Sequence, residues 1–168
     1  KLLEAGEGDV EVSLSETKKR FVYGNAVLVS KLIDGNFPDY ERVIPAGNEK
    51  LMEVDCKVFK DAVDRVSVIS SEKSRAIKLQ LENGKLTLSA GGADKDSASE
   101  ELEIAYSSSA IEIGFNSRFL VEMVSNLDCD EITIEMSAPN RAGIILPTNK
   151  SNPAEDILML VMPVMLNN

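Results

Sequence analysis

The sequence of 168 residues contains no histidine and only two cysteines. Histidine is the only side chain whose ordinary pKa lies near neutral pH, and it is a common zinc ligand, so its absence disfavours general base catalysis and zinc binding. Cys56 and Cys129 lack the spacing of a metal site, and each falls at the edge of a predicted helix. We therefore expect two reduced structural thiols, as in cytosolic proteins, and no metal or cofactor.

Known catalytic and nucleotide-binding motifs are also missing. The sequence has no Gly-x-Ser-x-Gly, P-loop or dinucleotide-binding pattern. The isolated pair Gly91-Gly92 is followed by acidic sequence, which does not suit a phosphate. Asp128, Asp130 and Glu131 cluster between a predicted helix and a predicted strand, as a solvated turn or as a weak metal site. The absence of a clear site favours a binding or structural protein over an enzyme.

No apolar run approaches the roughly 18 residues of a membrane span, and no signal peptide is visible. The chain begins with Lys1, and residues 1–4 read like the end of a helix, so we expect a fragment of a longer protein. Hydrophobic residues make up 43% and charged residues 27%, which is typical of a folded protein. The net charge of −10 argues by itself against nucleic-acid binding, which normally uses a basic surface.

Three strands are predicted before residue 46. Apolar and polar residues alternate over residues 10–14, 20–23 and 26–32, as in half-buried strands. The pair Gly24-Asn25 supplies a tight hairpin turn between the second strand and the third. An irregular segment follows and runs to Pro45.

A strand and an amphipathic helix follow the irregular segment. Residues 51–54 alternate, and Asp55 is a suitable N-cap. The apolar residues of the helix recur at i, i+1, i+4, i+5 and i+8, which places them in one stripe. These residues are Val58, Phe59, Ala62, Val63 and Val66.

Three more strands complete this pattern. Residues 76–81 and 85–89 alternate around Asn83-Gly84, which is a strong hairpin signal. A polar, acidic loop is predicted over residues 91–101, and a further strand over residues 101–105. The order is therefore β-α-β-β-β.

The same order recurs 61 positions further along the chain. Residues 110–114 form a strand and Asn116 is a suitable N-cap. The helix stripe is repeated by Phe119, Leu120, Met123, Val124 and Leu127. The remaining strands are predicted over residues 131–136, 143–146 and 157–166. Agreement of cap, stripe and strands predicts an α+β fold of duplicated βαβββ units, with two helices packed across one face of antiparallel sheets.

The irregular segment carries a family resemblance. Residues 30–40 read Ser-Lys-Leu-Ile-Asp-Gly-Asn-Phe-Pro-Asp-Tyr, residues 112–116 read Glu-Ile-Gly-Phe-Asn, and residues 161–163 read Val-Met-Pro. This wording resembles the bacterial DNA polymerase III beta subunit, the sliding clamp family. The resemblance covers the whole chain and implies that residues 1–45 are the last part of a middle clamp domain with its linker. Residues 46–168 would then be the complete C-terminal clamp domain.

The resemblance implies a DNA-clamp fold and a non-catalytic processivity factor of DNA replication in the cytoplasm. Full-length chains of the family form a homodimer ring that encircles duplex DNA without sequence specificity and has no membrane partner. The ring tethers DNA polymerase III subunits, the clamp loader and other proteins through a pocket that binds short peptides.

The resemblance also assigns residues to that peptide pocket. They come from the linker, from the loop after the first helix, from the start of the second helix and from the C-terminus. The set is Pro38, Arg42, Val43, Ser74, Asn116, Phe119, Leu160, Met162, Pro163 and Val164. Structural roles are the alternative: Pro38 stiffens a linker, Asn116 caps a helix and Phe119 joins the core. Ser74 replaces a bulky aromatic residue of some relatives, which implies a wider pocket mouth.

The C-terminal run over residues 157–166 is wholly apolar and contains three methionines. It fits either a strand buried on both faces or an edge where methionines form an adaptable groove. Pro163 disfavours a central strand because proline has no backbone N–H. The family usually ends Met-Pro-Met-Arg-Leu, whereas Pro163 is followed here by Val164, Met165, Leu166 and two asparagines. The resemblance therefore does not fix the exact shape of the adjoining pocket.

Two charged regions complete the implied roles. The ring interior, facing DNA, would present Lys57, Lys60, Arg65 and Arg118. The ring interface would involve Val68, Ile69, Asp94, Asp96, Glu100 and Glu101. Ordinary solvated helix faces and a solvated acidic loop are the alternatives.

Two other functions remain open at this point. One is an acidic α+β protein-interaction module with no DNA role, and a non-duplicated topology would favour it. The other is an enzyme with a carboxylate–metal site at Asp130 and Glu131.

Overall fold

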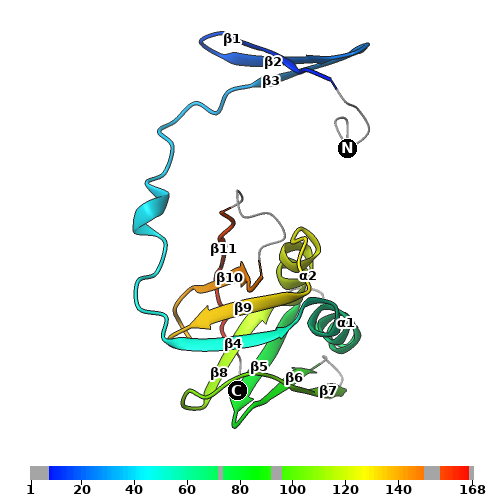
Figure 1. Cartoon of the computed structure of the whole chain (residues 1–168), viewed down its shortest axis with the longest axis vertical. Helices are drawn as coiled ribbons and strands as arrows, with labels where there is room; N and C mark the ends of the chain where they lie inside the picture. Colours follow the sequence, from blue (N-terminus) through cyan, green and yellow to red (C-terminus); the bar gives the residue numbers. More distant parts are fainter. Residues whose placement is uncertain (1–7, 72–73, 92–95, 150–155, 167–168) are drawn as a thin grey trace. The chain divides into compact units, whose positions relative to one another are not determined.

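The structure is a computed structural model that describes residues 8–71, 74–91, 96–149 and 156–166 (Figure 1). The chain divides into two compact units, Lys1–Asp39 and Tyr40–Asn168. None of the helices in these described ranges has both the length and the apolar character needed to cross a membrane.

The first unit is a three-stranded antiparallel sheet. It contains β1 (Glu11–Leu14), β2 (Lys18–Tyr23) and β3 (Ala26–Lys31), paired in the order β1-β2-β3. The three predicted strands are confirmed, and Gly24 adopts a φ of 54° in the predicted hairpin turn, a region that glycine enters without strain. Among residues 8–39 no side chain is buried, so the described part of this unit has no core of its own.

The second unit begins with a short 3₁₀ helix, Tyr40–Arg42, and the first predicted repeat follows it. Its elements are β4 (Lys50–Asp55), α1 (Cys56–Ser67), β5 (Ala76–Glu82), β6 (Lys85–Gly91) and β7 (Ser97–Glu103). The order is confirmed, but the loop predicted over residues 91–101 is too long. The strand β7 starts inside that loop because it pairs with β6 along its whole length, and an edge strand tolerates polar residues.

The second repeat follows directly. Its elements are β8 (Ile111–Asn116), α2 (Ser117–Ser125), β9 (Glu131–Met136), β10 (Gly143–Pro147) and β11 (Met159–Val161). The strands β8 and β4 have the same length and lie 61 positions apart, as the duplication requires.

The structure distinguishes the two interpretations of residues 157–166, a strand buried on both faces or an edge strand. The strand predicted over residues 157–166 is wrong in length, because β11 has three residues and ends before Pro163, which cannot donate to a ladder. The strand is not buried on both faces, because it lies at the edge of its sheet and only Val161 of its three residues is buried. The edge interpretation is the one that the structure bears out.

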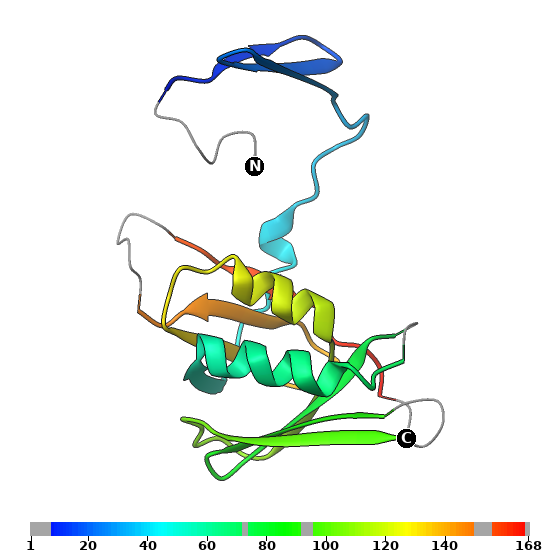
Figure 2. The ribbon, with the colours of Figure 1, turned by 90° about the vertical axis from the view of Figure 1, so that its right-hand side faces the viewer.

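The two repeats exchange their first strands. The sheet order is β11-β10-β9-β4 in one sheet and β7-β6-β5-β8 in the other, so β4 pairs with the second repeat and β8 with the first. The helices α1 and α2 pack against each other and lie on the same side of the two sheets (Figures 1 and 2). The exchange therefore joins both repeats into one interlocked body.

One hydrophobic core fills this body, with contributions from both helices and both sheets. The predicted stripes are confirmed except at their margins. Val58 is 47% exposed and Phe119 is 53% exposed, because residues at i and i+1 of such a stripe point about 100° apart and one reaches solvent. Leu127 is buried but lies beyond the end of α2 at Ser125.

The backbone after the last strand of each repeat crosses to the opposite sheet. Beyond β7, Ala105 exchanges two backbone hydrogen bonds with Glu53 of β4, at 3.0 and 3.1 Å. Beyond β11, the Val164 N–H donates to the Gly114 carbonyl of β8 at 2.9 Å. Each crossing therefore links the edges of the two sheets.

Candidate peptide-binding site

The start of α2 joins two of the predicted pocket residues. The Asn116 Oδ1 accepts a hydrogen bond from the Arg118 N–H at 3.0 Å, which caps the helix. The Asn116 Nδ2 donates to the Ser74 carbonyl at 3.1 Å, so one side chain holds both the helix and the loop. The predicted capping role is therefore confirmed, and it places Ser74 beside Asn116.

Phe119 lies one turn further along and faces the C-terminal strand. It lines a hollow of about 390 Å³ together with Glu122, Met123, Asn126 and Met159. The half-exposed ring of Phe119 is therefore not part of the core. Sequence reasoning did not identify Met123 or Met159 as lining residues, although Met123 follows Phe119 by four residues and so shares its helix face.

The C-terminal segment forms an apolar surface next to this hollow. Leu160, Pro163 and Val164 are half-buried, whereas Met162 is 60% exposed. Exposed methionine is flexible and polarisable, which suits an adaptable contact surface.

Gly114 allows this segment to lie against β8. A Cβ atom there would stand 2.7 Å from the Val164 carbonyl oxygen and 2.6 Å from the Leu166 Cδ2. Only glycine leaves room for the terminal segment at this point. Gly114 stands within the resemblance-bearing residues 112–116, but the sequence alone did not indicate this packing role.

The linker side of the predicted pocket begins at a short 3₁₀ helix, Tyr40–Arg42. Arg42 is exposed, and Val43, which donates its N–H to the Tyr40 carbonyl at 3.0 Å, is 52% exposed. Asn48 fixes the chain that follows, because its Nδ2 donates to the carbonyls of Glu135 and Ala142, both at 3.1 Å. Sequence reasoning missed this anchor, since a single asparagine in a loop gives no pattern.

Pro38 belongs to the other unit, where it is exposed.

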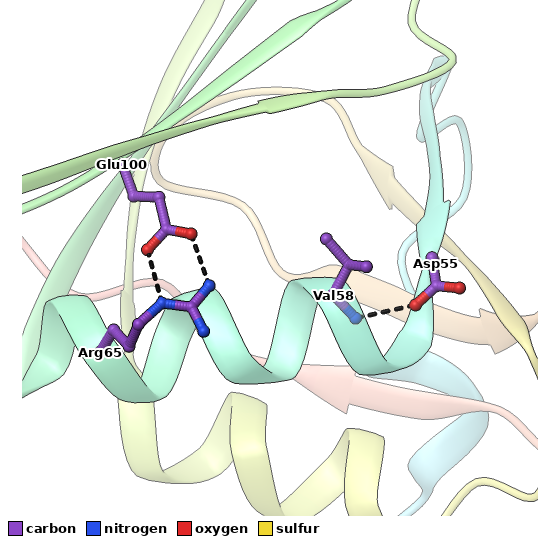
Figure 3. Close-up of polar contacts among 4 residues, drawn as sticks. All are labelled: Asp55, Val58, Arg65 and Glu100. Carbon is purple, nitrogen blue, oxygen red and sulfur yellow. Dashed lines mark hydrogen bonds and ion pairs between the residues drawn. The ribbon is translucent and has the colours of Figure 1, made fainter.

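The four cations predicted to face DNA all lie on the helices, but they differ in their surroundings. Lys57 and Arg118 are exposed and Lys60 is half-buried. The Arg65 guanidinium donates to both carboxylate oxygens of Glu100, with Nε–Oε2 at 3.0 Å and Nη2–Oε1 at 2.6 Å (Figure 3). The hydrogen bonds from Arg65 lower the pKa of Glu100, so the charge of Arg65 is compensated within the chain.

The residues predicted at the ring interface are partly engaged within the chain as well. Glu100 pairs with Arg65, and Glu101 lies 2.9 Å from the Lys85 ammonium. Val68 is 82% exposed, Ile69 is half-buried and Asp96 is exposed. Asp94 lies outside the described residues.

The carboxylate–metal alternative lacks a geometric basis. Within the described ranges, no three His, Cys, Asp or Glu side chains are grouped so that they could hold a metal ion. Asp128, Asp130 and Glu131 are exposed and do not converge on one point.

Interlocked βαβββ repeats with paired helices define an α+β domain of the DNA-clamp type. A family model described as the DNA polymerase III beta subunit, C-terminal domain, matches residues 41–164. The chain belongs to this family.

Curated and solved relatives agree with this assignment. A protein named beta sliding clamp from Caulobacter vibrioides is 44% identical over 146 residues, which is 87% of this chain and 39% of that protein. A crystal structure of the DNA polymerase III subunit beta from Pseudomonas aeruginosa has a TM-score of 0.89 and 33% identity, over 98% of this chain and 44% of that one.

A crystal structure of a sliding clamp from Bartonella birtlesii, bound to griselimycin, has a TM-score of 0.84 and 43% identity. The match covers 95% of this chain and 42% of that chain. The chain therefore spans about two fifths of the length of the relatives it matches.

Proposed function

We propose that the whole protein is a non-catalytic processivity factor of DNA replication in the cytoplasm. Full-length chains would form a homodimer ring that encircles duplex DNA and tethers DNA polymerase III subunits, the clamp loader and other proteins. The names of the relatives support this proposal, since each is a sliding clamp or a polymerase III beta subunit. In this proposal residues 1–45 are the last part of the middle domain together with the linker, and residues 46–168 are the complete C-terminal domain.

The observation that carries the tethering role is the half-exposed Phe119 beside an apolar hollow and an exposed methionine edge. The hollow is lined by residues of both α2 and β11, and the exposed Met162 extends this apolar surface. Short peptides bind such surfaces by inserting a few apolar side chains. We assign Arg42, Val43, Ser74, Asn116, Leu160, Pro163 and Val164 to the same peptide-binding site.

The helices are proposed to line the ring interior. Lys57, Lys60 and Arg118 would supply weak phosphate contacts, while Arg65 contributes less because Glu100 neutralises it. A ring is retained on DNA by its topology, so the acidic total charge is compatible with encircling it. The exposed Val68 and the acidic strand β7 are proposed to face the partner chain.

The peptide site can be tested with a labelled peptide that contains a glutamine followed by a Leu-Phe pair. We expect Phe119→Ala to weaken binding by about tenfold or more, because buried aromatic contacts dominate such interfaces. Met162→Ala should weaken it less. Fluorescence anisotropy with the 168-residue chain measures both effects.

The duplication offers a matched control. Val58 of α1 occupies the position equivalent to Phe119 and is also about half exposed. Val58→Ala should leave peptide affinity unchanged. Equal losses for Val58→Ala and Phe119→Ala, or no loss for Phe119→Ala and Met162→Ala together, would remove the pocket assignment.

A further inference from the structure

The two cysteines lie near each other although they stand 73 positions apart in the sequence. Cys56 is the first residue of α1, and Cys129 lies two residues before β9. Asp55 pairs with Glu131 at the end of the β4–β9 ladder, and the Cys56 N–H continues it by donating to the Asp130 carbonyl at 2.7 Å. Cys56 is therefore aligned with the direct neighbour of Cys129.

This alignment leaves Cys56 one residue out of register with Cys129 across two adjacent backbones. Neighbouring strands lie about 4.8 Å apart, and disulfides join Cα atoms about 4.4–6.8 Å apart. Both side chains line the same hollow, and, after burial, the nearness of Cys129 is one of the causes that raise the pKa of Cys56. The Cys56 Sγ lies 3.8 Å from the Val124 carbonyl in the last turns of α2, which holds it at this junction.

Small reagents can reach the pair. Both cysteines line a hollow of about 540 Å³ at the junction of α1 with the loop after α2. Cys129 is half-buried, whereas Cys56 is 8% exposed. Cys129 is thus the thiol that a dissolved oxidant meets first, and Cys56 lies behind it.

Metal binding is a weaker use of this pair. The described residues contain no group of three or more His, Cys, Asp and Glu side chains that could hold an ion. Two thiols at the end of a strand ladder have the arrangement of a disulfide-forming pair.

We propose that Cys56 and Cys129 form a reversible intramolecular disulfide when the protein meets hydrogen peroxide. The Cys129 sulfur attacks one peroxide oxygen, the O–O bond breaks, and the products are a sulfenic acid at Cys129 and water. The Cys56 sulfur then attacks the Cys129 sulfur, the S–O bond breaks, and a second water leaves. Overall, two thiols lose two electrons and two protons, and one peroxide becomes two waters.

The expected rate follows from the thiolate population. Burial is the main cause that raises the pKa of both thiols, and that of Cys56 reaches about 11. Because the thiolate is the nucleophile, oxidation should be slow at neutral pH and should accelerate as the pH rises.

Mass spectrometry of the 168-residue chain tests the proposal. The chain is treated with hydrogen peroxide, blocked with iodoacetamide under denaturing conditions and digested with trypsin. Cleavage at Lys50, Lys57, Arg118 and Arg141 places the cysteines in peptides 51–57 and 119–141. We expect a linked 51–57/119–141 species in the monomer fraction, and we expect dithiothreitol to remove it.

Two variants provide the controls. Cys129→Ser and Cys56→Ser each leave a single thiol, so neither should yield the linked species in its monomer. The proposal is overturned if the wild-type thiols both remain open to iodoacetamide, if Cys129 proceeds to a sulfinic or sulfonic acid without the link, or if the link appears only in dimers.

Discussion

The two repeats of the second unit share one scaffold but end in edges of opposite chemistry. The strand β7 has seven residues and carries Glu100, Glu101 and Glu103, whereas β11 has three residues and is apolar. Both are edge strands, which must avoid pairing with other chains. Charge protects β7, while brevity and Pro163 protect β11. The duplication therefore conserves the core and leaves the edges to differ, which is where the proposed partner-binding surfaces lie.

The crossings behind these edges differ in the same way. In the first repeat, Glu53 exchanges backbone hydrogen bonds with Ala105, and its side chain stays exposed. Gly114 occupies the equivalent position and is buried, because Leu166 and the Val164 carbonyl lie against it. The second repeat thus closes over its own first strand with the apolar C-terminal segment.

If the cores are equivalent, substitutions at matched positions should be similarly costly. Phe59 of α1 and Leu120 of α2 lie 61 positions apart, and both are fully buried. We expect Phe59→Ala to lower the free energy of unfolding by about 3–5 kcal/mol and Leu120→Ala by about 2–5 kcal/mol, through lost burial and cavity formation. Urea unfolding monitored by circular dichroism measures both. A loss below about 1 kcal/mol at either position would show that the repeats are not equivalent.

The sequence predicted this duplicated core because apolar spacing, caps and hairpin turns are local signals. Asp55 and Asn116 both cap their helices as expected, with Asp55 accepting from the Val58 N–H at 2.7 Å (Figure 3). The exchange of β4 and β8 between sheets could not be predicted in this way, because pairing across more than 30 residues depends on tertiary packing. The nearness of Cys56 to Cys129 depends on that exchange, because it follows from the β4–β9 ladder, and it was missed for the same reason.

The candidate site was predicted through family resemblance more than through pattern. In the sequence, Asn116 gave the ordinary signal of a helix cap and Phe119 that of a core residue. The structure departs from the second signal alone, because the Phe119 side chain is 53% exposed. The sequence predicted the wrong lengths for β7 and β11. In β7, an edge strand, apolar and polar residues alternate only weakly. In the C-terminal run, Pro163 ends the strand by lacking a single backbone N–H donor.

A single methyl group at position 114 should displace the C-terminal segment from β8. Gly114→Ala would place a Cβ within 2.7 Å of a backbone oxygen, so the terminal segment must move. We expect a loss of about 1–3 kcal/mol in the free energy of unfolding, together with weaker peptide binding. Glu53→Ala, at the matched position, should change neither by more than about 0.5 kcal/mol. Similar results for both variants would mean that the two crossings are alike.

A further difference lies at the first residue of each helix, where Cys56 matches Ser117. Burial raises the pKa of Cys56 from 9.0 to about 11, so the folded state favours the neutral thiol. Its contribution to stability is present below pH 9.0 and is lost as the pH rises through about 11. Cys56→Ala should therefore lose less stability than the wild type over this range. Parallel urea midpoints from about pH 8 to about pH 11 would contradict this account.

The smallest expected effect concerns the charged edge itself. Arg65 links α1 to β7 through Glu100, whereas the matched position, just beyond the end of α2, is the uncharged Asn126. The pairing lowers the pKa of Glu100, so its stabilisation is present above the ordinary value of 4.5 and is lost as the pH falls through the lowered pKa.

Because Arg65 is exposed, Arg65→Ala should cause only a small decrease in the urea midpoint at about pH 7. That decrease should shrink at about pH 3, and it should also shrink in high salt. Lys57→Ala, which removes an exposed cation from the same helix, should show neither dependence on Glu100 protonation nor a comparable change. A pH-independent decrease for Arg65→Ala would mean that the packing of its aliphatic stem, not its charge, joins the helix to the edge strand.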